Sequence, residues 1–224
     1  MLIIIQARLS SKRLPGKVLK KINGLEIIKH LIRNLKNTKH NLKIIVATSN
    51  TISDKKLVSF LKKNNILHFC DSLNNVSLRL LNCALFYKAK YFVRLNGDSP
   101  FIDNNIIKKM LSFFKRNQNK FDLITNVYPR TFPKGQSVEI IKTSCLKRIV
   151  RKKLSKNYQE HVTKFIYDNS KLFKIKNIPN SINLSKYSLC VDTKEELKLF
   201  KKKLKNVSFA KSVKFTKLIK AVYE

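Results

Sequence analysis

The sequence predicts an α/β fold: a mostly parallel β-sheet covered by helices on both faces. Short runs rich in β-branched and aromatic residues alternate with segments of about 10–15 residues whose apolar positions follow helical spacing. The chain has 224 residues and contains neither an internal repeat nor a low-complexity linker. This length fits one domain over residues 1–224, large enough to bury a core without disulfides.

The first two-thirds of the chain gives strand and helix signals in regular alternation. Strands are predicted where β-rich apolar runs occur, at residues 2–7, 43–48, 66–70 and 91–95. Helices are predicted where apolar residues recur three or four positions apart, at 27–35, after the candidate caps Ser53 and Asp54, at 76–88, and from Asp103 onward. Strands joined by helices in this way pair in parallel through right-handed crossovers.

The pattern becomes looser after about residue 122. Short strands are expected near residues 122–126, 138–141, 173–178 and 187–191. Helices are expected near residues 143–153, 158–168, 193–204 and 213–222. Extra strands added to an open parallel sheet would give this pattern, together with an excursion within about residues 125–185 that we expect to serve a dimer contact.

The formal net charge of +35 raises the alternative of a basic nucleic-acid-binding protein without enzyme activity. Lysine is far more frequent than arginine, and the lysines are spread over every segment, as expected for solvated helix faces. The sequence contains no groove-reading helix motif and no platform of interleaved aromatic residues. We therefore expect no nucleic-acid partner, but a mild attraction for small anions such as triphosphates.

Cysteine usage and apolar runs indicate a reduced, cytoplasmic protein. The cysteines form no C-x-x-C pair, so we expect buried thiols rather than a zinc site; they are Cys70, Cys83, Cys145 and Cys190. The apolar start lacks a basic flank and meets Arg8 too soon for a signal peptide. No apolar run approaches the ~20 residues of a membrane span, so no membrane partner is expected.

The most informative stretch is the loop after the first predicted strand. Residues 8–17 place two arginines, two lysines, two serines and a Pro-Gly turn directly after a buried run. Backbone N–H groups and cations gathered in such a loop can cradle a polyphosphate, although a solvated basic loop would have the same composition. It is not a Walker A loop, because Ser11 and Val18 stand where that motif needs Gly and Ser or Thr. The four glycines lie too far apart for a G-x-G-x-x-G site.

Three polar stretches, at residues 8–17, 96–103 and 192–195, each follow a predicted strand. Ligands of open α/β sheets bind outside the carboxyl ends of strands, so these stretches could converge on one crevice. Taken alone, Asp98 also fits an ordinary Asn-Gly-Asp turn, and Asp192 fits the start of a helix. Arg79 also fits a helix surface, and a histidine such as His161 on the polar side of a helix is more often a packed or capping residue.

Five motifs stand in order along nearly the whole chain: QAR, S and RLPGK at residues 6–8, 11 and 13–17; VATS at 46–49; VRLNGDSPFID at 93–103; EHVT at 160–163; and VDTKEEL at 191–197. Together they resemble the cytidylyltransferases that activate 3-deoxy-manno-octulosonate and N-acylneuraminate, especially the branch of spore-coat polysaccharide biosynthesis protein F. The first and third motifs are the most specific.

The resemblance implies a Rossmann-like, three-layer nucleotidyltransferase fold, a homodimer, and transfer of CMP from CTP to an acidic sugar with Mg²⁺, for surface polysaccharide or glycan synthesis. It implies a nucleotide site formed by Ala7, Arg8, Ser11, Arg13, Lys17, Thr48, Arg79, Asn96 and Asp98. Within that set, the catalytic residues are Lys17, Asp98 and Arg13. The metal ligands are Asp98 and Asp192, and the acceptor would contact Glu139 and His161.

The chain departs from the family pattern at two places. Ser137 stands where the branch commonly has an aspartate, which leaves the acceptor open rather than the nucleotide chemistry. Asn74 and Asn75 replace acids expected there. A second alternative therefore keeps the fold but uses another nucleoside triphosphate, or a phosphorylated alcohol as acceptor.

Overall fold

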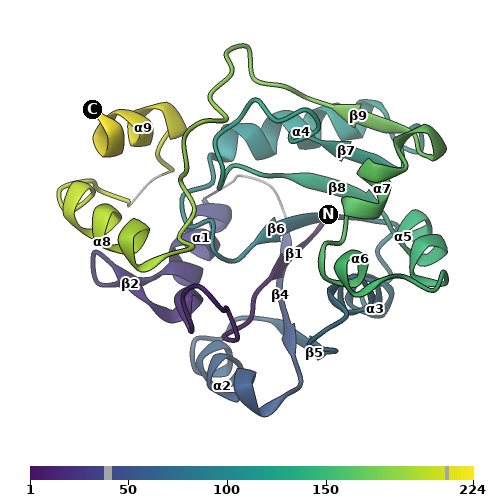
Figure 1. Cartoon of the computed structure of the whole chain (residues 1–224), viewed down its shortest axis with the longest axis horizontal. Helices are drawn as coiled ribbons and strands as arrows, with labels where there is room; N and C mark the ends of the chain where they lie inside the picture. Colours follow the sequence, from purple (N-terminus) through teal and green to yellow (C-terminus); the bar gives the residue numbers. More distant parts are fainter. Residues whose placement is uncertain (38–41, 210–211) are drawn as a thin grey trace.

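The computed structural model of the chain describes residues 1–37, 42–209 and 212–224. A seven-stranded sheet crosses its centre in the order β5-β4-β1-β6-β8-β7-β9 (Figure 1). Its strands are β1 (Leu2–Gln6), β4 (Lys43–Ser49), β5 (His68–Asp71), β6 (Tyr91–Asn96), β7 (Leu123–Thr125), β8 (Glu139–Lys142) and β9 (Ile175–Asn177). In this sheet β8 is antiparallel to both neighbours and the other pairs are parallel, so the predicted mostly parallel sheet is confirmed.

Strand β1 is buried on both faces because its residues alternate between two hydrophobic cores. Ile3 and Ile5 belong to one core, and Leu2 and Ile4 belong to the other. The first core includes residues of α1 (Ile27–Lys36), α2 (Lys55–Lys63), α4 (Asn104–Arg116), α8 (Lys194–Lys203) and α9 (Phe215–Tyr223). The second includes residues of α3 (Val76–Phe86), α5 (Thr143–Val150) and α7 (Lys164–Asp168). The expected three layers of helix, sheet and helix are therefore present.

The parallel strands bring their carboxyl ends to one edge of the sheet. Gln6 lies level with Ala47 of β4 and with Asn96 of β6. At this edge the chain after β6 passes close to the chain after β1, because a Cβ atom on Gly97 would lie 3.0 Å from the Ala7 Cβ and 3.0 Å from the Gln6 carbonyl oxygen. Glycine thus permits the two loops to meet.

The helix predicted over residues 158–168 is wrong as a single element. The structure has α6 (Lys156–Glu160) and α7, with a break between them at residues 161–163. His161 has φ −100° and ψ 82°, outside the helical region, and the next two residues, Val162 and Thr163, are both buried. The Tyr158 carbonyl, which a continuing helix would pair with the Val162 N–H, instead accepts a hydrogen bond from the Ser77 hydroxyl of α3 at 3.0 Å.

The strand predicted over residues 187–191 is also wrong. This segment forms one isolated bridge, between Ser188 and Lys134, because its backbone groups bond to two different loops. Leu189 N–H donates to the Lys134 carbonyl at 2.8 Å, whereas Val191 N–H donates to the Asp98 carbonyl at 2.9 Å. Asp192 therefore follows a loop rather than a strand of the sheet.

Several expectations of residue environment can be compared with the structure. All four cysteines are free thiols; three are buried as expected, but Cys70 is exposed. Over the described residues, no helix combines the length and apolar character needed to cross a membrane. Residues 125–185 contribute β8, β9 and helices α5 to α7 to the same fold, and their role in a dimer stays a prediction.

Candidate active site

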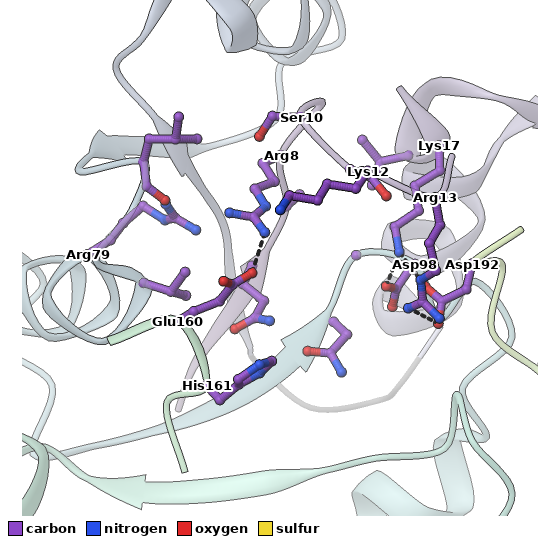
Figure 2. Close-up of a pocket in the computed structure, with 18 of the residues that line it drawn as sticks. Arg8, Ser10, Lys12, Arg13, Lys17, Arg79, Asp98, Glu160, His161 and Asp192 are labelled. Carbon is purple, nitrogen blue, oxygen red and sulfur yellow. Dashed lines mark hydrogen bonds and ion pairs between the residues drawn. The ribbon is translucent and has the colours of Figure 1, made fainter. Parts of the chain in front are cut away.

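A pocket of about 690 Å³ opens at the carboxyl ends of β1 and β6. Its lining comes from the loop after β1, the turn after β6, the start of α3, the junction between α6 and α7, and Asp192 (Figure 2). The three polar stretches predicted to converge thus do so. The basic side chains outnumber the acidic ones in this lining; they are Arg8, Lys12, Arg13, Lys17 and Arg79.

The loop after β1 is held in place at both ends. Leu14 and Val18 are buried in the core, which leaves the residues between and before them to face the pocket. Gly16 has φ +67°, a left-handed conformation that glycine adopts without a Cβ clash. Its N–H donates to the Leu9 carbonyl at 2.9 Å and so closes the turn that presents Lys17.

A buried carboxylate, Asp54, fixes the start of the same loop. It accepts hydrogen bonds from the Leu9 N–H at 2.6 Å and the Ser49 N–H at 3.1 Å, and its side chain is fully buried. The sequence predicted a cap for the following helix, but no side-chain capping bond is present at Asp54. The correction has a physical reason: the carboxylate instead accepts from the N–H groups of Leu9, in the loop after β1, and of Ser49, at the end of β4.

One end of the pocket contains a compact cluster of two cations and two carboxylates. Lys17 Nζ lies 2.5 Å from Asp98 Oδ2 and 2.6 Å from Asp192 Oδ1 (Figure 2). The guanidinium of Arg13 lies 2.9 Å from the other oxygen of Asp192. Because both carboxylates contact one nitrogen, their oxygens cannot be further apart than the sum of two hydrogen-bond lengths. The structure therefore places Asp98 and Asp192 in one crevice, as the sequence predicts.

Burial and charge act in opposite directions on this cluster. Burial alone would lower the pKa of Lys17, but the charges of Asp98 and Asp192 and their hydrogen bonds outweigh it and raise that pKa above its ordinary value. Burial would likewise raise the pKa of Asp192, but its hydrogen bond to Lys17 and the charges of Lys17 and Arg13 hold that pKa below its ordinary value. Lys17 and Asp192 therefore both stay charged near neutral pH.

The other end of the pocket is formed by Arg8, Glu160 and Arg79. Arg8 and Glu160 form an ion pair at 2.5 Å, which links the loop after β1 to the end of α6 (Figure 2). Arg79 is buried rather than on the helix surface, and its Nη1 donates to the Ser72 carbonyl at 2.5 Å. Its Nε has no hydrogen-bond partner in the part of the chain that the structure describes. Burial, and then the charge of Arg8, lower the pKa of Arg79 to about 10, so it remains a cation.

Most of the remaining predicted nucleotide and acceptor residues also line the pocket. Ala7, Ser11 and Asn96 lie along its floor and basic loop, and His161 lies at the junction after α6. His161 is exposed to solvent, so it is not packed in the core as an ordinary helix histidine would be. It can therefore contact a ligand directly.

Two predicted residues do not reach this pocket. Thr48 lies on β4 with its hydroxyl buried and without a hydrogen-bond partner. Glu139, at the start of β8, forms an ion pair with Arg94 and accepts a hydrogen bond from the Tyr167 hydroxyl. Burial, and then the charge of Glu139, raise the pKa of Tyr167 strongly. Glu139 is thus part of a buried network one strand away from the pocket floor.

The residues that depart from the family pattern have clear structural environments. Ser137 Oγ accepts from both Nη atoms of Arg130 at 3.2 Å each. Among the described residues, no carboxylate lies within ion-pair distance of Arg130. Asn75 caps α3, since its side chain accepts from the Leu78 N–H at 2.9 Å, and Asn74 lines the pocket.

Sequence reasoning missed some residues of the pocket. Gln6, Lys12 and Glu160 line it, and Asp54 supports it from below. Glu160 could have been found, because it stands next to His161 in the fourth motif. Asp54 could not, because its role depends on two loops that meet only in the folded chain.

Comparison with known proteins agrees with this geometry. The family model for cytidylyltransferases matches residues 2–220. The chain is 29% identical over 207 residues to spore coat polysaccharide biosynthesis protein SpsF of Bacillus subtilis, which covers 89% of this chain and 84% of that protein. It is 27% identical over 128 residues to the 3-deoxy-manno-octulosonate cytidylyltransferase of Elusimicrobium minutum, over 57% of this chain and 51% of that one.

A solved structure gives the same result for the fold. The cytidylyltransferase of Leptospira borgpetersenii superimposes with a TM-score of 0.91 at 32% identity, over 98% of this chain and 93% of that chain. The alternative of a nucleic-acid-binding protein without enzyme activity is thereby set aside. The chain belongs to the cytidylyltransferase family and is a nucleotidyltransferase.

Proposed function

We propose that the protein transfers the CMP part of CTP to a hydroxyl group of an acidic sugar and releases pyrophosphate. The observation that carries this proposal is the cluster at one end of the pocket, where Asp98 and Asp192 face the basic loop across Lys17. Carboxylates for a metal and cations for phosphates are the two components that phosphoryl-type transfer needs.

The basic loop would hold the triphosphate. Arg8, Arg13 and Lys17 supply charge-assisted hydrogen bonds, and the Ser11 hydroxyl adds a neutral donor. Arg79 stands at the far end of the lining, where its buried guanidinium would add positive charge. These groups neutralise the charge that develops on the phosphate oxygens, and they hold the α-phosphate in one orientation.

Asp98 and Asp192 fit a magnesium ion. One oxygen of each carboxylate converges on the same point of the pocket, and Mg²⁺ prefers oxygen ligands, commonly one or two carboxylates completed by substrate phosphates and water. When bound, magnesium acts as a Lewis acid that polarises a phosphoryl oxygen. The residues around the carboxylates would then hold the substrate in one orientation and keep it from binding in others.

The proposed chemical step is a direct displacement. The sugar hydroxyl oxygen forms a new bond to the α-phosphorus, the bond from that phosphorus to the bridging oxygen breaks, and pyrophosphate leaves with the electron pair. The hydroxyl proton passes to solvent or to a neighbouring base. No covalent enzyme intermediate is required, which agrees with a lining that holds no cysteine among the described residues.

The experiment that tests this function is a screen of pyrophosphate release. Four nucleoside triphosphates are combined with a panel of acidic sugars, neutral sugars and phosphorylated alcohols, with Mg²⁺ present. We expect release above background only with CTP and one class of acidic sugar, and none with the Asp98→Asn variant. Preference for another nucleotide, or for a phosphorylated alcohol, would favour the alternative substrates instead.

A further inference from the structure

The position of Lys17 is unusual for a residue whose expected partner is a phosphate. Its ammonium lies between Asp98 and Asp192, at 2.5 and 2.6 Å, and its side chain is only 13% exposed. The buried residues Leu14 and Val18 fix the backbone on both sides of it. Lys17 is therefore held at the carboxylate pair by the folded chain, before any ligand is considered.

The same two carboxylates are those that fit magnesium. A divalent ion that took Asp98 Oδ2 and Asp192 Oδ1 together would need the space that Lys17 Nζ holds, because the ion and the ammonium contact the same oxygens. Two cations in one such space also repel each other. The ammonium and the metal are thus competitors for one site.

Arg13 cannot take over this role. It contacts one oxygen of Asp192 only, and its side chain is 67% exposed, so solvent screens most of its charge. Asp98 has Lys17 as its cationic partner among the described residues. Once Lys17 leaves, the two carboxylates therefore face each other with little compensation.

We propose that Lys17 is a resident counter-ion that keeps divalent metal out of the Asp98–Asp192 pair until a triphosphate arrives. This inference rests on the proposed function, since the triphosphate is the ligand that draws the ammonium away. A polyphosphate carries more negative charge than the two carboxylates, and it binds beside the same loop. Lys17 then contacts the phosphate, and the vacated carboxylates accept the metal. Metal and nucleotide enter together, and a nucleoside without phosphates cannot complete the site.

The test is the binding of Mn²⁺, a paramagnetic substitute for Mg²⁺, without nucleotide. Free Mn²⁺ is followed by electron paramagnetic resonance during titration of wild type, Lys17→Met and Lys12→Met. Lys12 is the matched control: it lines the same pocket, is exposed, and has no carboxylate partner among the described residues. We expect Lys17→Met to bind Mn²⁺ about 10- to 150-fold more tightly than wild type, the range that corresponds to one charge-assisted hydrogen bond. Lys12→Met should bind as wild type does.

Adding Asp98→Asn to Lys17→Met locates the effect. The double variant should lose the gain in Mn²⁺ affinity, because one of the two carboxylates is gone. Circular dichroism establishes that each variant is folded, and Lys17→Gln replaces Lys17→Met if the latter is not. Equal Mn²⁺ affinities for wild type and the Lys17 variant would overturn the proposal, as would weaker binding by the variant, which would make Lys17 a support of the carboxylates.

A second titration separates this proposal from the proposed function. Mn²⁺ binding is measured with CTP present, for wild type and for Asp98→Asn alone. If Asp98→Asn weakens Mn²⁺ binding in the presence of CTP, the metal role of Asp98 is supported. This holds even if the Lys17 variants show no gain in Mn²⁺ affinity. If Asp98→Asn changes nothing with CTP, the metal site of the proposed function is wrong, whatever the Lys17 variants show.

Discussion

The backbone N–H of Val191 donates to the carbonyl oxygen of Asp98 at 2.9 Å. Asp192 follows Val191 directly, so this one bond brings the second carboxylate beside the first, although the two come from different halves of the chain. The acid pair of the pocket thus depends on contact between two loops, not on two neighbouring strand ends. The chemical role of the acid pair and the stability of the loops that form it can be tested separately.

The nucleotide preference is the first prediction. CTP with Mg²⁺ should raise the melting temperature of the protein more than ATP or GTP with Mg²⁺, because at equal concentration the ligand that binds the folded state more tightly stabilises it more. Differential scanning fluorimetry at matched ligand concentrations measures the shift. Equal shifts for all nucleotides, or no shift, would remove the main support for a cytidine nucleotide.

The acid pair gives the second prediction. Asp98→Asn should lower turnover about a thousandfold, since about 4 kcal/mol of phosphoryl polarisation corresponds to three decades of rate. Asp192→Asn should lower it by a similar or smaller factor. Initial rates of pyrophosphate release measure both, with Asp168→Asn as control, because Asp168 is an exposed carboxylate paired with Lys164. A turnover near wild type in Asp98→Asn would exclude Asp98 from the mechanism.

The third prediction concerns the phosphate contact of Lys17. In the complex its ammonium should make a charge-assisted hydrogen bond worth about 1.5–3 kcal/mol. Lys17→Met should therefore lower kcat/KM roughly 10- to 150-fold, at about 1.4 kcal/mol per decade. Steady-state kinetics with varied CTP measures it, with Lys12→Met beside it. An unchanged kcat/KM would show that Lys17 does not contact the bound phosphates.

The fourth prediction uses Ser137 and Arg130. Ser137→Asp should raise the free energy of unfolding by about 1 kcal/mol, because a carboxylate at 137 can pair with the half-buried guanidinium of Arg130, whose side-chain partner among the described residues is the Ser137 hydroxyl. Urea unfolding should show a higher midpoint at an unchanged slope. Ser137→Asn is the matched neutral variant. If it stabilises the protein equally, charge pairing is not the cause.

The fifth prediction concerns the close approach of Gly135 to the segment before Asp192. Gly135 has φ +88°, and a Cβ there would lie 2.6 Å from the Leu189 carbonyl carbon, so Gly135→Ala should destabilise the protein by about 2 kcal/mol or more. Gly24 has φ +76° with nothing within 4 Å of its Cβ position, so Gly24→Ala measures the backbone strain alone. Equal losses in the two variants would mean that the close approach carries no energy.

Much of the fold could be predicted because its signals are local. The alternation of Leu2 to Ile5 between two cores, and the helical spacing of residues 27–35, are properties of short windows of sequence. The two departures from the predicted elements do not depend on local sequence. The first helix ends at His161, where the Tyr158 carbonyl bonds to Ser77 of α3, and residues 187–191 lack a strand because their partners lie in two loops. In neither case can the hydrogen-bond partners be predicted from the sequence of the segment itself.

The candidate site divides in the same way. The basic loop and Asp98 could be predicted because each directly follows a strand whose end is clear in the sequence and belongs to a motif that resembles the cytidylyltransferases. Three other features depend on tertiary packing. Lys17 pairs with both carboxylates, Arg79 is buried, and Glu139 pairs with Arg94 outside the pocket. The sequence therefore predicts many of the site residues, but the interactions among them depend on the folded structure.

The buried carboxylate of Asp54 has a consequence for how a ligand is received. By holding the Leu9 and Ser49 backbones, it orders the basic loop while the chain folds. A loop already ordered loses little conformational entropy when a ligand arrives. We therefore expect a preorganised pocket, in which the exchange of partners at Lys17 and Arg8, rather than closure of a loop, determines the strength of nucleotide binding.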